Sequence, residues 1–123
     1  MKIVAIGLGG FVGAFLRYAA EQWLPWPESF PLGTIVINGL GCLFLGWFFS
    51  ISSTPKYPPA LRLGIGIGAA GAFTTFSTFS FESVQFLSHH DFGFAALYVC
   101  LNVLGGMGLS ASGSFWARRK RVT

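Results

Sequence analysis

Apolar residues fall into four long runs along this chain, separated by short linkers rich in proline or polar residues. We place these runs near residues 3–24, 32–51, 61–87 and 92–116. Each is long enough to cross about 30 Å of hydrocarbon, which needs roughly 20 helical residues. The pattern predicts an all-α membrane protein with four transmembrane helices, organised as a single domain over residues 1–123.

The third run is too long for one straight span, and its centre is polar. From Gly71 to Phe79 it reads GAFTTFSTF, which places three threonines and a serine among phenylalanines. A helix facing lipid gains nothing from such hydroxyls at bilayer depth, whereas a bent or hydrated backbone does. We therefore expect a broken third helix, with its freed carbonyls held by a cation, hydroxyl groups or water.

The composition agrees with a membrane protein, because 53% of the residues are hydrophobic and only 10% are charged. On a four-helix topology, every lysine and arginine except Arg17 gathers on one side. They are Lys2, Lys56, Arg62, Arg118, Arg119, Lys120 and Arg121. The positive-inside rule then predicts a multi-pass protein of the cell membrane with both termini in the cytoplasm. We interpret the basic tail as a topology anchor and expect no nucleic-acid partner.

In the first run, Gly9, Gly13, Arg17 and Glu21 recur every four residues and so share one helix face. The two glycines permit close helix contact, and Arg17 can pair with Glu21. Arg17 either extends to the membrane interface or acts as a vestibule cation that attracts anions.

Polar side chains of the second and third runs have two interpretations each. Asn38 could tie two helices together, or its amide could donate weakly to an anion. Phe76 and Phe79 could be ordinary packing, or their positive ring edges could favour an anion in a pore. Glu82 is either an interfacial carboxylate or a modulator of ion passage.

The fourth run carries Tyr98 and Asn102 on one side, which indicates either helix-to-helix hydrogen bonds or a hydrated track. Cys42 and Cys100 lie in apolar runs and are interpreted as small packing residues. His89 and its neighbour His90 fit a solvated turn better than a metal site. We expect no enzyme, because the chain offers no nucleophile–base arrangement, phosphate-binding glycine loop or shared carboxylate pair.

Three motifs carry a resemblance to a known family. GGFVGAFLRY from Gly9 matches GGxxGAxxRY, GTIVINGLGCLFLG from Gly33 resembles GTxxVNxxGxFxxG, and TTFSTF from Thr74 is unchanged. In this order and at this separation, the motifs make the chain similar to the Fluc/CrcB family of small fluoride channels.

The resemblance implies an antiparallel dimer with two pores, through which fluoride leaves the cytoplasm passively. The residues implied for the fluoride pore are Asn38, Thr75, Phe76, Ser77, Thr78, Phe79, Ser80, Tyr98 and Asn102. Arg17 and Glu82 would serve in a vestibule or in gating. The carbonyls of Gly71 and Thr74 from both subunits would hold one structural sodium ion at the dimer interface.

The charge bias is unexpected for an antiparallel homodimer, since dual insertion favours balanced positive charge. A heterodimer with an oppositely oriented paralogue is therefore an alternative. Two other classes remain open: a small multidrug-exporter-like transporter and a non-conducting membrane assembly subunit. The exporter would need a carboxylate central to the first helix, where this chain has only Glu21 near the end.

Overall fold

The computed structural model describes residues 1–120; Arg121, which was counted in the basic tail, lies outside the described residues. Over this part of the chain the regular structure is entirely helical, which confirms the all-α prediction. The elements are α1 (Lys2–Trp23), α2 (Leu32–Ser52), α3 (Pro59–Leu63), the π-helical η1 (Gly64–Ala70), α4 (Gly71–Phe73), α5 (Phe76–Ser88) and α6 (Phe92–Arg119).

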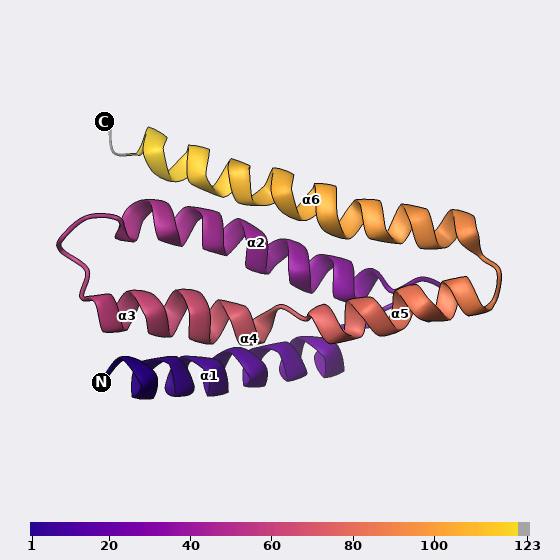
Figure 1. The fold of residues 1–123 in the computed structure, drawn as a ribbon, viewed down its shortest axis with the longest axis horizontal. Coiled ribbons are helices and arrows are strands. Elements are labelled where there is room, and N and C mark those ends of the chain that lie inside the picture. The colour runs from indigo at the N-terminus through magenta and orange to yellow at the C-terminus, as the bar shows by residue number, and fades with distance from the viewer. Residues whose placement is uncertain (121–123) are drawn as a thin grey trace.

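Over residues 1–120 the chain runs back and forth as helical rods, each antiparallel to the rod before it in the sequence (Figure 1). The elements α3, η1, α4 and α5 follow one another as the third rod, which lies between α1 and α2 in this view, and α6 lies on the far side of α2. Within residues 1–120, α1, α2 and α6 are each long and apolar enough to cross a membrane. The third rod reaches comparable length only through several elements in series.

Charge divides along the rods. One end, here called the basic end, is where α1 and α3 begin and α2 and α6 end (Figure 1). The side chains there are Lys2, Lys56, Arg62, Arg118, Arg119 and Lys120. The opposite half, called the acidic end, contains all four carboxylates of the chain. They are Glu21, Glu28, Glu82 and Asp91.

The break in the third rod lies inside the predicted hydroxyl cluster. Thr74 has φ −73° and ψ 156°, and Thr75 has φ −135° and ψ 124°. Both residues are therefore extended, which interrupts the i→i−4 hydrogen bonds between α4 and α5. The backbone groups freed there need partners from elsewhere in the fold.

Glycine allows the rods to approach closely at two interfaces. A Cβ at Gly9 or Gly13 of α1 would collide with the carbonyl oxygen of Gly64 or Ala69 in η1. A Cβ at Gly46 of α2 would likewise collide with the backbone of α6. This confirms the predicted contact face of the first helix, because only a hydrogen side chain fits at such backbone-to-backbone distances.

Candidate functional site

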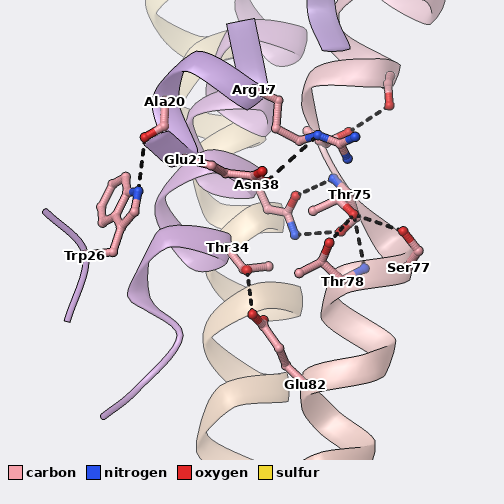
Figure 2. A network of polar contacts seen from close by, with 12 residues as sticks. Arg17, Ala20, Glu21, Trp26, Thr34, Asn38, Thr75, Ser77, Thr78 and Glu82 are labelled. Carbon is pink, nitrogen blue, oxygen red and sulfur yellow. Dashed lines mark hydrogen bonds and ion pairs between the residues drawn. The ribbon is translucent and has the colours of Figure 1, made fainter. Parts of the chain in front are cut away.

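Asn38 of α2 faces the break, and its side-chain amide hydrogen-bonds both the N–H and the carbonyl oxygen of Thr75 (Figure 2). Its Oδ1 accepts from the Thr75 N–H at 2.8 Å, and its Nδ2 donates to the Thr75 carbonyl oxygen at 3.0 Å. Nδ2 also donates to Oδ1 of Asn102 at 3.2 Å. Both amide hydrogens of Asn38 therefore have partners within the chain.

Hydroxyl groups close the two helix ends at the break. Thr75 is the N-cap of α5 and accepts from the Thr78 N–H at 3.1 Å, while its own hydroxyl donates to Thr78 Oγ1 at 3.0 Å. Ser77 Oγ lies 3.3 Å from the same hydroxyl of Thr75. On the other side, Thr74 donates to the carbonyl oxygen of Ala70 at 3.0 Å. Much of the cluster is thus used to satisfy the broken backbone.

Glu82 of α5 connects two other helices. Thr34 of α2 donates to its Oε1 at 3.2 Å, and the Tyr98 hydroxyl of α6 donates to its Oε2. Tyr98 is fully buried, and Asn102 donates to the Tyr98 carbonyl oxygen at 3.1 Å. The carboxylate is therefore an internal hydrogen-bond acceptor, and its bonds reach from the acidic end toward the break.

The phenylalanines beside the break form a short aromatic series. The ring centroids of Phe76 and Phe79 are 5.7 Å apart, and Phe79 stacks on Tyr98 with centroids 5.6 Å apart. Phe76 is 79% exposed, so most of its ring has no neighbour within the single chain.

Three cavities follow this polar network along the rods. A cavity of about 260 Å³ contains Asn38, Thr75, Phe76, Phe79 and Asn102 in its lining. A second of about 540 Å³ shares Asn102, Cys42 and Val103 with the first and extends along α6 to Ser110 and Ser114. At the acidic end, a third of about 560 Å³ includes Thr34, Thr78 and Glu82.

The charges at the third cavity are mostly negative. Glu21, Glu28 and Glu82 all line it, together with His89. Arg17 pairs with Glu21, with Nε 4.0 Å from Oε1, but is not among the described lining residues. Arg17 is thus paired with one of the carboxylates that line this third cavity, here called the vestibule.

The structure brings five of the nine proposed pore residues into one cavity, the one that contains Asn38 and the two phenylalanines. Tyr98 lies against Phe79, and Thr78 lines the neighbouring vestibule. Ser77 is exposed and Ser80 half-buried, and neither lines these three cavities. Sequence reasoning missed the two hydrogen bonds between the Asn38 side chain and the Thr75 backbone, for which no local pattern gives a signal.

A broken helix braced by an asparagine, set among long apolar helices, defines a small helical membrane protein with polar side chains gathered at the break. The chain belongs to the CrcB family: the model described as "CrcB-like protein, Camphor Resistance (CrcB)" matches residues 4–114.

Similar proteins come from both bacteria and archaea. The chain is 42% identical over 113 residues to fluoride-specific ion channel FluC 1 of Bacillus cereus, covering 89% of this chain and 78% of that protein. It is 39% identical to FluC of Oceanobacillus iheyensis over 91% of this chain and 88% of that one. FluC of Methanococcus maripaludis is 40% identical over 94% and 98% of the two chains.

Proposed function

We propose that this chain forms a fluoride-specific channel that lets fluoride leave the cytoplasm passively through the cell membrane. Its similar proteins are named fluoride-specific ion channels. The observation that carries the proposal is the cavity at the break, where uncharged polar groups and two phenylalanines meet in an apolar segment. Neutral donors suit an anion that must bind and then leave again.

The proposed route runs from Ser114 and Ser110 past Asn102 to the break, and then to Thr78 in the vestibule. Fluoride holds its water tightly, so hydroxyls, amides and aromatic edges must replace that water along the way. Because both Asn38 hydrogens already have partners, Asn38 can donate to the ion only when one of those bonds opens.

An antiparallel homodimer would complete the pore. Phe76 is 79% exposed in the single chain, and a pore residue needs a wall on both sides. A four-helix chain without an internal repeat gains inverted symmetry by pairing with an oppositely inserted copy. The basic end of one copy would then lie beside the acidic end of the other, which favours this pairing electrostatically.

A structural sodium ion fits the donor chemistry at the break. Within the described residues no cluster of histidine, cysteine or carboxylate side chains could hold a metal. The candidate ligands are instead the carbonyl oxygens of Gly71 and Thr74, which suit a hard cation. Gly71 is exposed, with open space beside its Cα. Two carbonyls from each of two copies would give four ligands, and the bound ion would add positive potential beside both pores.

Fluoride efflux from liposomes loaded with potassium fluoride or chloride tests the channel. We expect wild-type vesicles to release fluoride but retain chloride, and Phe76→Ile or Phe79→Ile to reduce fluoride efflux at least about 100-fold, because the ring edges are lost. Phe81→Ile is the matched control, since Phe81 is exposed on the same helix and lines none of the three cavities. Equal release of both ions, or none by the wild type, contradicts a fluoride channel.

Labelling tests the dimer. Lys56→Cys places a thiol in the exposed α2–α3 linker, in a background without the two native cysteines. Dual insertion predicts that a membrane-impermeant reagent labels about half of the thiols from each face. Labelling from one face alone would instead support a single orientation and an oppositely inserted paralogue as partner.

A further inference from the structure

A fourth cavity lies at the basic end, away from the proposed ion route. It has a volume of about 550 Å³ and sits where α2 ends and α3 begins. Phe49 and Ser52 of α2, Tyr57 of the linker and Arg62 of α3 contribute to its lining. No carboxylate lines it, and all four carboxylates of the chain belong to the acidic end.

Two polar side chains at this cavity have unused hydrogen-bonding atoms. Within residues 1–120, the buried Nε of Arg62 and the buried Oγ of Ser52 have no hydrogen-bond partner. Ser52 is only 2% exposed. Buried donors without partners cost free energy, so such a pair indicates a ligand that supplies acceptors.

The guanidinium of Arg62 is held in place on one face. Its Cζ lies 5.4 Å from the centroid of the Phe49 ring, and this cation–π contact leaves the edge of the guanidinium for a ligand. A planar guanidinium edge binds the oxygens of a phosphate in pairs. Ser52 can donate a further hydrogen bond, and Tyr57 also lines the cavity.

We propose that this cavity binds a phosphate group, and specifically the headgroup phosphate of an anionic phospholipid. The cavity is much larger than a halide ion and lies at the end of two helices, where a bilayer changes from acyl chains to headgroups. Basic pockets between helices on the positive side of a membrane protein suit such headgroups. The site depends on the chain lying in a membrane but not on fluoride conduction.

Native mass spectrometry of the purified full-length protein, titrated with phosphatidylglycerol, measures this binding. We expect Arg62→Gln to weaken it about tenfold, because the paired hydrogen bonds and the charge are lost. Ser52→Ala should weaken it about threefold. Lys56→Gln removes the same charge from an exposed position in the α2–α3 linker that does not line the cavity, so lipid binding should stay within about twofold of the wild type.

A second arm separates lipid from free phosphate. Inorganic phosphate added alone should not raise the thermal midpoint of the lipid-free protein, whereas phosphatidylglycerol should. A rise with phosphate that equals the rise with lipid, and that Arg62→Gln abolishes, would uphold the phosphate site but overturn lipid as its source. If Arg62→Gln does not fold, Ser52→Ala decides. Equal lipid binding by Ser52→Ala and wild type, or by Arg62→Gln and Lys56→Gln, overturns the site.

Discussion

The side chain of Asn38 supplies Thr75 with the hydrogen-bond partners that a continuous helix would have provided. Its amide accepts from the N–H of this residue at 2.8 Å and donates to the carbonyl oxygen at 3.0 Å, in the way that a neighbouring strand would. The third rod can therefore leave helical geometry within an apolar segment without leaving these two peptide groups unpaired.

Asn38→Leu should lower the free energy of unfolding by about 2–4 kcal/mol, because it leaves the N–H and carbonyl oxygen of Thr75 without a hydrogen-bond partner. Unfolding in mixed micelles, followed by circular dichroism, measures the loss. Ser112→Ala is the control: its hydroxyl also bonds a backbone carbonyl but is exposed on α6, so a change below about 0.5 kcal/mol is expected. An equally small change for Asn38→Leu would show that the hydrogen bonds between Asn38 and Thr75 contribute little to stability.

Thr75→Val should lower the free energy of unfolding by about 1 kcal/mol, because valine keeps the shape but cannot accept from the Thr78 N–H. Thr75→Ser keeps the capping oxygen and should recover most of that stability. The same unfolding measurement compares the two variants. Identical losses for valine and serine would mean that side-chain volume, and not the cap, sets the stability here.

Glu82 and Tyr98 should be energetically coupled, since the Tyr98 hydroxyl donates to the carboxylate inside the fold. A double-mutant cycle with Glu82→Gln and Tyr98→Phe is expected to give a coupling energy of about 1–3 kcal/mol. The cycle Glu82→Gln with Tyr18→Phe is the control, because Tyr18 is exposed on α1. Additive effects of Glu82→Gln and Tyr98→Phe would contradict a direct bond.

Gly13→Ala should destabilise the protein by about 1–3 kcal/mol, because its Cβ would collide with the backbone of Ala69 and push α1 away from η1. Gly7→Ala is a matched change in the same helix with open space around it, and alanine there should be neutral or stabilising by up to about 1 kcal/mol. Thermal midpoints in detergent compare the two. Similar midpoints for both variants would mean that the two rods do not pack this closely.

Features encoded by local pattern could be read from the sequence. The position of the break followed from hydroxyls placed among phenylalanines, and the contact face of α1 followed from the spacing of Gly9 and Gly13. In both cases the physical constraint, unpaired backbone in lipid or close helix approach, acts on neighbouring residues and leaves a short motif.

The contacts that brace the break could not be read in the same way. Asn38 and Thr75 are 37 positions apart, and Glu82 collects donors from α2 and α6. Such pairings depend on helix rotation and depth, which hydrophobic pattern fixes only to within a face. The sequence therefore identified Asn38 as a possible donor to an anion or a link between helices, without showing which groups it bonds.

Because α2 supplies the partners of Thr75, the break also bears on the order of biogenesis. A third segment entering the bilayer alone would expose two peptide groups to acyl chains, which hydrocarbon penalises severely. Since α2 is synthesised first, it can already be in place when the following residues leave the translocon. Insertion of the third rod is then coupled to the pairing of Thr75 with Asn38, and a defect at Asn38 would act during assembly as well as in the finished protein.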